Sequence, residues 1–574
     1  MADSAMLDED ARLEEALDER ADHIPVAELK QGTAKADFFE EIHRSLTARG
    51  TKLVVGPRGC GKTHMMRYTW LMCQEDESLP LAIYVTFNRY YRLEPLLKTR
   101  SNAVDLFHGW VIARILIALT EISSTPPQGV KFTTQDLIGF ELEDLQDLVD
   151  RLERGLPLTS GAEHTLSFLS VNKLVSSIEL ACDHYSRKRA VVLLDDAALT
   201  LTPEYLFEFF DVVRVMRTQR VSPKASVYPA TDYGPRFHAA HEAEEVPVWL
   251  SVDRPNYREL MGEISTHRLP TVRVPADVDQ VLKLAAFGVP RAYLTMLRDF
   301  SRSTGTQSQV LNRVIENHAE AKREEYRSMA LKMPRFESLI RVGGQLLDGM
   351  LRELRDAQES ALARSEKQLV IGIPEGEIVE AALVERMFNL LLEAGLVFQA
   401  QTVSHGEGRL YRRYMPHLAA LISARSVSGG TRSSAAGQLA YALSQKSTKH
   451  PLRRTLAKLV DSSAIAELRI DLPACRVCGT ERLTSQQKFC HACGSELLDD
   501  STFARCMSLP LTAVPGLTVW QRDKIGTLDR IKTIGDLLAI QDPGSELRKL
   551  HRVGNVRAAK IVQMVTAFVD EFLS

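Results

Sequence analysis

The sequence predicts an α/β fold in which a parallel sheet carries a phosphate-binding loop, with smaller modules following toward the C-terminus. Three observations predict it. A short apolar run at 52–55 leads directly into Gly-x-x-x-x-Gly-Lys-Thr at 56–63 and then into a helix. A second apolar run, 190–194, ends in an acidic pair. Two CxxCG motifs lie far downstream, at 475–479 and 490–494.

The loop at 56–63 has the residues that a phosphate site needs. Gly56 and Gly61 let the backbone bend so that successive N–H groups face a phosphate. The helix that follows adds the partial positive charge of its N-terminus. A plain glycine-rich turn is the alternative, but strand, complete motif and helix occur together. We therefore expect ATP or GTP to contact the loop residues Gly56, Pro57, Arg58, Gly59, Cys60, Gly61, Lys62, Thr63 and His64.

Two side chains of the loop have specific roles in such a site. Lys62 would reach the β- and γ-phosphates, and the hydroxyl of Thr63 would bind Mg²⁺. The acidic pair supplies the rest. Asp195 would hold Mg²⁺ directly or through its water, and Asp196 would orient the attacking water. A buried strand ending in a solvated acidic turn is the alternative. Most such ATPases have Glu at the second place, so the shorter Asp196 predicts slow or partner-dependent hydrolysis.

Apolar patterning predicts the elements around these motifs. A helix at 36–46 precedes the loop, and a strand at 81–87 follows the first helix. An apolar helix is expected within 102–124, a helical insertion over 125–165, and further helices at 168–185 and 203–217. The remaining expected elements are a strand at 225–231 ending in Thr231, a strand at 246–252, and a helical region at 277–300 in which a helix opens at Gly288-Val289-Pro290-Arg291.

These motifs together resemble the origin-recognition, replication-initiator branch of the AAA+ ATPases, over about residues 35–425. The matching stretches are Gly56–Thr63, Val191–Asp196, the Thr231 strand end and Gly288-x-Pro-Arg291. The resemblance implies that the Thr231 strand lies between the two motif strands and senses the γ-phosphate. It also implies a helical lid whose Arg291 contacts phosphates, although Arg291 could instead be a surface arginine at a helix start.

Enzymes of this family assemble, and a neighbouring subunit supplies an arginine finger that stabilises the transition state. Arg236 and Arg254 are the two candidates for that finger. Residues 331–425 look like a winged helix: helix 379–394, strand 396–400, turn 404–408 and strand 409–414. In the initiator family this module binds DNA, so Arg409, Arg412 and Arg413 could contact phosphates. A winged fold used for protein contacts is the alternative.

The two CxxCG motifs predict a zinc ribbon. Four thiolates around one tetrahedral ion are typical of structural Zn²⁺, whereas a catalytic site would keep an open position. The module is so small that the metal must stabilise it. A redox pair of CxxC motifs is the alternative. The expected zinc ligands are Cys475, Cys478, Cys490 and Cys493.

The last segment contains two hairpin signals, at 513–517 and 550–561. They resemble tandem helix-hairpin-helix modules, which hold DNA by its phosphates without reading sequence. Gly554 and Ala558 match the motif, while Arg552 stands where it usually has glycine. Residues 438–574 carry 19 Lys/Arg against 14 Asp/Glu, net +5, which suits a nucleic-acid face. Docking to a protein is the alternative.

Composition sets the outer limits. Of 574 residues, 45% are hydrophobic and 25% charged, which is typical of a soluble protein. No run approaches the ~20 apolar residues of a membrane span, and the acidic start lacks a secretory h-region. The cysteine pattern suits a reducing compartment, so we expect a cytoplasmic protein without membrane contact. The expected divisions are 1–34 acidic tail, 35–275 AAA+ core, 276–330 lid, 331–425 winged helix, 426–437 flexible linker, 438–471 helical connector, 472–500 zinc ribbon and 503–574 helix-hairpin-helix domain.

The sequence therefore predicts a Mg²⁺-dependent ATPase whose nucleotide state controls its assembly and its grip on DNA. It would form a homo-oligomer or a complex with a separate effector protein. The resemblance suggests roles in replication, transposition or antiviral defence against phage. The alternative is a signalling or scaffold ATPase whose C-terminal modules bind a partner protein. A third possibility is a switch that binds ATP and scarcely hydrolyses it.

Overall fold

The computed structural model describes residues 24–573 apart from a set of gaps. The predicted acidic tail at 1–22, part of the wing turn and most of the linker lie outside the described residues. The gaps are 89, 123–133, 197–202, 407–408, 428–435, 471, 473, 476, 484–486, 488, 496, 498–501, 516, 529 and 541.

A five-stranded parallel sheet forms the centre of the N-terminal half, as predicted. Its strand order is β2-β3-β4-β1-β5, so β4 lies between the strands that end at the loop and at the acidic pair. Every neighbouring pair is parallel. The carboxyl ends of all five strands therefore meet at one edge, where ligands bind in open α/β sheets. The strands are β1 (Thr51–Val55), β2 (Leu81–Thr86), β3 (Ala190–Asp195), β4 (Val221–Val227) and β5 (Ala243–Pro247).

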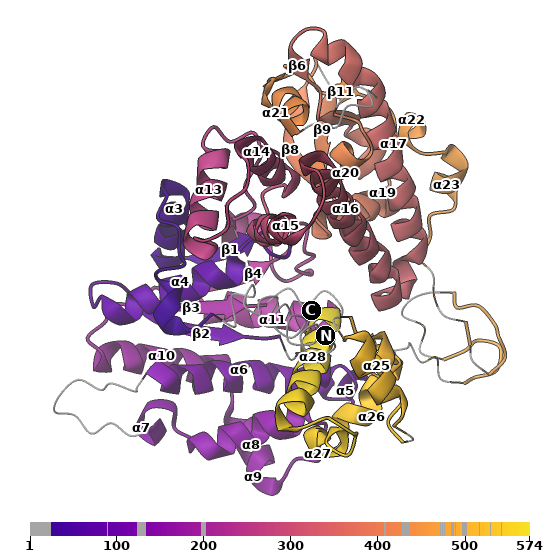
Figure 1. Ribbon diagram of the computed structural model, residues 1–574. Helices are drawn as coiled ribbons and strands as arrows, with labels where there is room; N and C mark the ends of the chain where they lie inside the picture. Colours follow the sequence, from indigo (N-terminus) through magenta and orange to yellow (C-terminus); the bar gives the residue numbers. More distant parts are fainter. Residues whose placement is uncertain are drawn as a thin grey trace.

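Helices cover both faces of this sheet, and alternate strand residues explain why (Figure 1). In β3, Val191 and Leu193 join one apolar cluster, while Val192 and Leu194 join the other. The first face is covered by α3 (Asp37–Thr47) and α4 (Lys62–Glu75), and the second by α6 (Ala103–Glu121), α10 (Val171–His184) and α11 (Pro203–Met216).

The helix α6 is long and apolar enough to cross a membrane by length and composition. However, 72% of its apolar window is buried inside the protein, where it packs on the sheet. The remaining helices of this half are α2 (Val26–Leu29), α5 (Leu96–Thr99), α7 (Thr134–Ile138), α8 (Leu142–Glu153), α9 (Ser160–Phe168), α12 (Ala239–Glu242) and α13 (Tyr257–Arg268).

Four helices lead from the sheet into the upper part of the molecule in Figure 1. They are α14 (Ala276–Ala285), α15 (Pro290–Arg302), α16 (Gln307–Lys332) and α17 (Glu337–Leu362). The expected helix start at Gly288-x-Pro-Arg291 is observed, with Pro290 in the first turn of α15. Proline suits that position because its missing N–H would have no helical partner there.

A helix–strand–turn–strand unit comes next, in the predicted order. Strand β9 pairs antiparallel with both β7 and β8. The prediction of a helical connector over 439–468 is wrong, because this stretch holds two strands as well as short helices, and β11 extends the sheet beside β7. The elements are β6 (Glu366–Lys367), β7 (Ile371–Pro374), α18 (Gly376–Val379), α19 (Ala382–Glu393), β8 (Val397–Ser404), β9 (Leu410–Pro416), α20 (Leu418–Ser423), α21 (Ala436–Ser444), β10 (Lys446–Ser447), β11 (Leu452–Arg453), α22 (Leu456–Leu459) and α23 (Ser462–Ala466).

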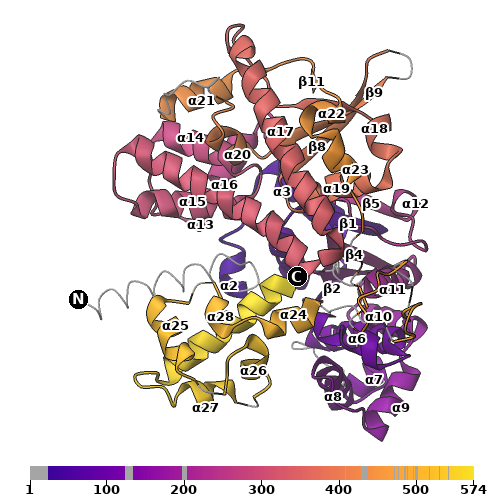
Figure 2. The ribbon, with the colours of Figure 1, turned by 90° about the vertical axis from the view of Figure 1, so that its right-hand side faces the viewer.

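The C-terminal helices form a small all-α body with its own apolar cluster. It lies below the ends of α16 and α17 in Figure 2 and touches the sheet domain through Glu94, whose carboxylate accepts a hydrogen bond from the Phe503 N–H at 3.0 Å. Its helices are α24 (Thr502–Ser508), α25 (Val519–Gly526), α26 (Ile534–Leu538), α27 (Pro543–Leu547) and α28 (Asn555–Leu573).

Candidate nucleotide-binding site

The loop after β1 adopts a bent conformation that only glycine tolerates at several points. Gly59 and Gly61 have φ of 86° and 91°, in the left-handed region that disfavours side chains. A Cβ on Gly56 would lie 2.9 Å from a Val248 methyl group, and one on Gly59 would lie 2.9 Å from Val289. Gly61 is the N-cap of α4, which begins at Lys62. The helix N-terminus therefore opens at the loop, as an anion site requires.

Lys62 folds back onto its own loop. Its Nζ donates to the carbonyl oxygens of Gly56 at 2.6 Å and Pro57 at 3.2 Å. The same ammonium lies 4.6 Å from the centroid of the Tyr228 ring. Burial lowers the pKa of Lys62. The carbonyl and ring contacts hold a charge that would otherwise lack a partner in this buried place.

The acidic pair ends β3, and its two carboxylates have different surroundings. Asp195 is 1% exposed, and its oxygens accept hydrogen bonds from Tyr84 Oη at 2.9 Å and Ser226 Oγ at 2.9 Å. Asp196 has a left-handed φ of 51°. Its carboxylate accepts from Thr86 Oγ1 at 3.2 Å, and its N–H donates to Ser226 at 2.9 Å. Asp195 is therefore a fixed, buried carboxylate, whereas Asp196 faces the cavity.

One cavity collects these groups. It encloses about 1230 Å³, open space at its mouth included, which exceeds the roughly 300–1,000 Å³ of typical ligand pockets. Of the predicted loop residues, all from Arg58 to His64 line it, while Gly56 and Pro57 do not. Asp196 and Arg291 also line it. The other lining residues include Gly32, Thr33, Ala34, Phe39, Asn88, Tyr228, Ile264, Arg268, Pro290 and Leu294.

Arg291 reaches the loop from the first turn of α15. Its N–H donates to the Gly59 carbonyl at 3.4 Å, and a Cβ on Gly59 would lie 3.2 Å from Arg291 Cβ. The start of α15 is itself held close to β5 and the segment after it, since a Cβ on Gly288 would lie 2.0 Å from the Leu250 carbonyl oxygen. The close packing at these glycines thus places the lid arginine beside the phosphate loop.

The predicted position of Thr231 at the end of the fourth strand is wrong. Strand β4 ends at Val227, and Thr231 lies in the turn beyond, where its hydroxyl donates to the Tyr228 carbonyl at 2.8 Å. Tyr228, the first residue after the strand, lines the cavity instead. Burial raises the pKa of Tyr228 to about 12, so its hydroxyl keeps its proton. The signal available in the sequence was the short alternation Val221–Val227, which ends one residue before an aromatic.

The two arginine-finger candidates lie outside the cavity lining. Arg236 forms an ion pair with Asp211 at 3.1 Å, with 68% of its side chain exposed. Arg254 lies over the Phe38 ring at 4.7 Å and contacts Glu41 at 3.8 Å. Both are on the surface, where a neighbouring subunit could be reached, and the geometry does not separate them.

Buried groups near the loop are neutral. Burial raises the pKa of the Cys60 thiol to about 12. Burial, with the neighbouring charges of Arg268 and Arg67, lowers the pKa of His64 to about 4. His64 Nε2 lies 2.8 Å from Thr33 Oγ1, which ties the first turn of α4 to the segment before α3.

The winged unit meets the loop from the other side. Gly395, in the turn after α19, has a φ of 71°, and a Cβ there would lie 3.3 Å from Pro57 Cβ. Of the three arginines expected at DNA, Arg412 is wrong: it pairs with Glu375 at 3.2 Å and Glu385 at 3.0 Å, with 18% of its side chain exposed. Arg413 donates to the Gln401 carbonyl across the hairpin, and Arg409 is exposed.

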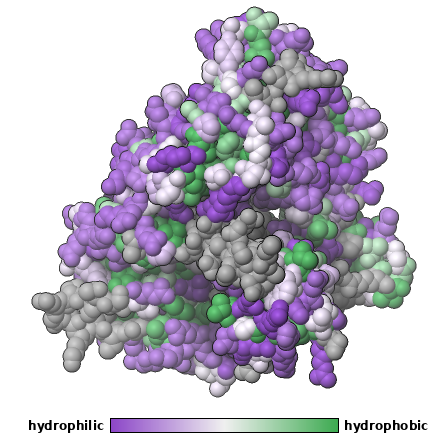
Figure 3. Space-filling model, viewed as in Figure 1, coloured by the Kyte–Doolittle hydropathy of each residue, from purple (hydrophilic) through white to green (hydrophobic). Residues whose placement is uncertain are grey.

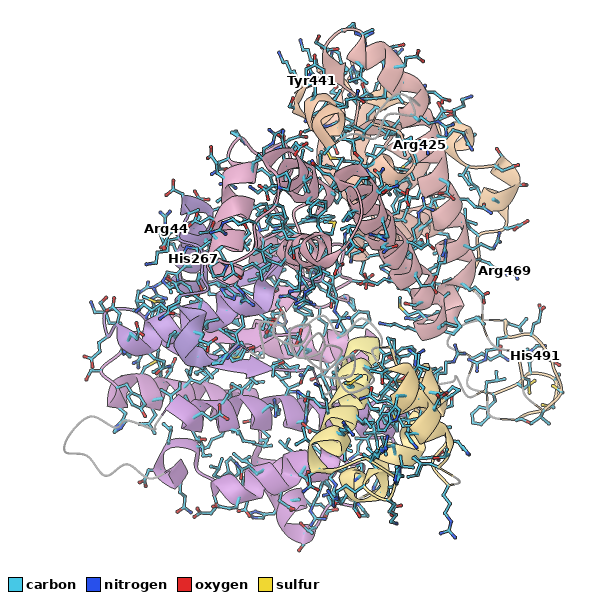
Figure 4. The ribbon with its side chains drawn as sticks, in the orientation of Figure 1. Arg44, His267, Arg425, Tyr441, Arg469 and His491 are labelled. Atoms are coloured by element: carbon cyan, nitrogen blue, oxygen red, sulfur yellow. The ribbon has the colours of Figure 1, made fainter. Side chains whose placement is uncertain are left out.

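The four predicted zinc ligands come together. One ligand atom from each of Cys475, Cys478, Cys490 and Cys493 lies within 4.8 Å of the others. Both turns close in the same way, since Gly479 N–H donates to the Cys475 carbonyl and Gly494 N–H to the Cys490 carbonyl. Four convergent thiols are the donor set that structural zinc prefers. His491, which Figure 4 labels, is exposed and is not part of the cluster.

The second hairpin of the tail retains its bend despite Arg552. That residue adopts φ of 69°, the left-handed conformation that glycine would supply at no cost. The Arg552 carbonyl accepts from Arg557 at 2.7 Å, and Arg557 also lies 5.4 Å from the Trp520 ring of the first module. The two helix-hairpin-helix signals are therefore linked by one arginine.

A comparison with protein families matches residues 35–217 to the ORC-CDC6-like family. This range contains the loop, the acidic pair and the first three strands of the sheet in chain order. No curated protein matches the sequence.

Three solved structures are similar at low identity. The Walker-type ATPase PABY2304 of Pyrococcus abyssi is 12% identical, with 68% of this chain and 95% of that chain covered and a TM-score of 0.35. The Aeropyrum pernix ORC1 protein, solved in complex with DNA, is 15% identical, covering 69% and 91%, with a TM-score of 0.28. A signal transduction ATPase with numerous domains, PH0952 from Pyrococcus horikoshii, is 11% identical, covering 68% and 42%, with a TM-score of 0.26.

Proposed function

Because the chain is an origin-recognition-like AAA+ protein whose ORC-CDC6-like domain spans residues 35–217, we propose that it binds and hydrolyses ATP and uses the nucleotide state to control its hold on DNA. One observation carries the nucleotide part. The loop from Arg58 to Thr63, the carboxylate of Asp196 and the lid residue Arg291 all line a single cavity. Backbone N–H groups, a lysine and an arginine at one place are what a triphosphate requires.

Thr63 and Asp195 are the residues that would hold Mg²⁺. The hard oxygen donors of a hydroxyl and a carboxylate suit that ion. Both Asp195 oxygens already accept hydrogen bonds, so this carboxylate acts best through a magnesium-bound water. The ion would neutralise charge on the phosphate oxygens. Asp196, at the cavity, is placed to orient the attacking water, and Tyr228 supplies a hydroxyl at the end of β4 in place of Thr231.

The test is turnover of ATP with and without DNA, on the wild type and on Lys62→Ala. We expect the wild type to release phosphate and Lys62→Ala to lose at least about 100-fold in turnover, since the ammonium stabilises charge on the transferred phosphoryl group. Equal rates in the two proteins would refute the enzyme. Nucleotide binding by the wild type without turnover would instead support the switch that scarcely hydrolyses ATP, and Asp196→Glu would then be expected to speed hydrolysis.

The tail is the better candidate for DNA contact. Its second hairpin keeps the bend that directs N–H groups outward, and Arg552, Arg557 and Lys560 surround it. Such contacts are electrostatic, so affinity should fall steeply with salt. We expect Arg552→Glu to weaken duplex binding about uniformly across sequences and to flatten the salt slope, whereas Arg412→Gln, in the ion pairs of the winged unit, should leave the slope unchanged.

A scaffold that binds a partner protein is the second candidate, and the ribbon favours it. Val477, Leu483 and Phe489 are 74%, 71% and 60% exposed. Large apolar side chains on such a small module are typical of a protein-docking surface, although the face of the molecule in Figure 3 is mostly hydrophilic. Absence of binding to single- and double-stranded DNA at low salt would select this candidate.

We also propose that the four-cysteine cluster binds one Zn²⁺ and that the protein works in the reducing cytoplasm, where its eight free thiols stay available. The expected result is one zinc per chain in the purified protein. Cys478→Ser should lower that content while leaving nucleotide affinity within twofold. A preparation that is fully folded at 472–500 without zinc would contradict the assignment.

A further inference from the structure

The nucleotide cavity has a wall that the phosphate chemistry does not use. It is formed by the segment 32–34, by Ile264 and Arg268 at the end of α13, and by Leu294 of α15. The segment is fixed to α13, because a Cβ on Gly32 would lie 3.4 Å from Arg268 Cδ and His267, labelled in Figure 4, lies 2.9 Å from the Gln31 carbonyl. A largely apolar wall continuous with a phosphate loop suits a planar base. A role for this wall in base recognition rests on the proposed nucleotide binding.

His64 is the polar side chain that joins this wall to the loop. It follows Thr63 directly and lines the cavity. Its Nε2 lies 2.8 Å from Thr33 Oγ1, and the same hydroxyl lies 2.6 Å from the Leu29 carbonyl oxygen. A hydroxyl has one hydrogen. The Leu29 carbonyl can only accept, so it takes that hydrogen, and the proton between Thr33 and His64 must belong to His64 Nε2.

The assignment fixes the other ring nitrogen. In a neutral imidazole one nitrogen donates and the other accepts, so Nδ1 carries a lone pair. Two guanidinium groups, those of Arg67 and Arg268, raise the electrostatic cost of a second proton on the ring. Thr33, which is 3% exposed, therefore locks His64 as a hydrogen-bond acceptor at Nδ1.

We propose that His64, oriented by Thr33, is the residue that selects the purine at its 6-position, accepting a hydrogen bond from a 6-amino group and rejecting a 6-oxo group. Adenine offers a donor there, and guanine and hypoxanthine offer an acceptor. Two facing lone pairs leave both groups unsatisfied, which costs more than a missing contact does. His64 is thus a specificity-determining residue for adenine nucleotides.

Inosine triphosphate isolates this position, because it differs from ATP only in carrying the 6-oxo group and its ring proton. The measurement is competition of ATP and ITP against a fluorescent triphosphate. We expect the wild type to bind ATP about 10- to 100-fold more tightly than ITP. His64→Leu should bring the ratio close to one by loss of ATP affinity, with ITP affinity retained. His64→Asn places an amide oxygen near the Nδ1 position and should preserve the preference.

Thr33 gives an independent pair of variants. Thr33→Val removes the acceptor that holds the proton on Nε2, so the ring can donate from Nδ1 and ITP should gain affinity. Thr33→Ser keeps the hydroxyl and should behave as wild type. This pair carries the test if His64→Leu does not fold. Equal wild-type affinity for ATP and ITP, or an unchanged ratio in both His64→Leu and Thr33→Val, overturns the inference. Failure to bind any triphosphate would instead overturn the proposed function.

Discussion

At the scale of single residues, the resting position of Lys62 shows what a phosphate must replace. The ammonium donates to two loop carbonyls and lies over the Tyr228 ring. A bound triphosphate would take over these interactions with a full negative charge, which makes stronger hydrogen bonds than carbonyl oxygens do. The exchange lets the loop keep its shape when the site is empty.

Tyr228 leads to the first prediction. Its hydroxyl lies at the cavity, beyond the end of β4, where the γ-phosphate is expected. Tyr228→Phe should lower kcat about tenfold, equivalent to roughly 1.4 kcal/mol of transition-state stabilisation, with KM within twofold. Steady-state phosphate release measures both constants. Thr231→Val is the matched control and should change kcat less than twofold. The reverse pattern, with Thr231→Val impaired and Tyr228→Phe normal, would restore Thr231 as the sensing residue.

Lys224 makes a prediction about pH. It is fully buried in β4 and donates to the carbonyls of Ala48 and Gly50. Burial, reinforced by Lys52 and Arg189, lowers its pKa to about 6, against about 10.4 in an unfolded chain. Between these values the unfolded state binds more protons, so the free energy of unfolding should rise with pH, by up to about 1.4 kcal/mol per pH unit.

The measurement is urea unfolding at pH 6.5 and pH 9, followed by a probe in the sheet domain. The wild type should gain stability over this range relative to Lys224→Met, which has no titratable group at the site. Parallel pH dependence in the two proteins would mean that Lys224 stays charged when folded.

At the scale of elements, α17 shows how one helix needs glycine at one place and not at another. A Cβ on Gly349 would lie 1.8 Å from the Leu459 carbonyl oxygen at the end of α22, whereas a Cβ on Gly344 would meet nothing within 4 Å. Gly349→Ala should therefore destabilise the winged unit by about 1–3 kcal/mol. Gly344→Ala should stabilise it by about 0.5–1 kcal/mol, since alanine loses less backbone freedom. Thermal unfolding of the two variants tests this. Equal effects would mean that α22 does not rest on α17.

The elements also show what the sequence could and could not specify. The loop at 56–63 and the strand before Asp195 were predictable because their signals are local: spacing, apolar runs and a helix start. The end of β4 was not, because it depends on pairing with β1 and β3, whose register places Val55 opposite Val227. The segment 439–468 was predicted to be helical because its strands have two residues each. Only their distant partners in β6 and β7 make them strands.

The site divides in the same way. Arg291 was predicted from a short lid motif, and the packing of Gly59 against the start of α15 brings it to the loop. Arg412 was misassigned because its partners, Glu375 and Glu385, come from other elements. Charge in a sequence indicates a possible contact, and only the fold shows which charges already neutralise one another.

At the scale of the whole molecule, the tail touches both of the bodies that hold nucleotide. Glu94 of the sheet domain, 8% exposed, accepts the N–H of Phe503 at the start of α24. Arg505 donates to the Leu331 carbonyl at 3.2 Å, and Lys332 lies 5.4 Å from the Phe572 ring. The last two contacts are at the C-terminal end of α16. The same helix carries Lys322 and Glu325, charges that act on Cys60 and Arg58 of the loop.

This arrangement predicts that Glu94 controls the docking of the tail. Glu94→Lys removes the acceptor and brings a positive charge toward Arg505, so α24 should separate from the sheet domain. A hydrogen bond to a charged group contributes about 1.5–3 kcal/mol, and amide exchange in 502–508 should therefore accelerate by about 10- to 100-fold when followed by mass spectrometry. Glu94→Gln retains an oxygen acceptor and should stay close to wild type. If exchange in α24 is the same in Glu94→Lys and wild type, the contacts at α16 alone hold the tail, and its position does not depend on the segment after β2.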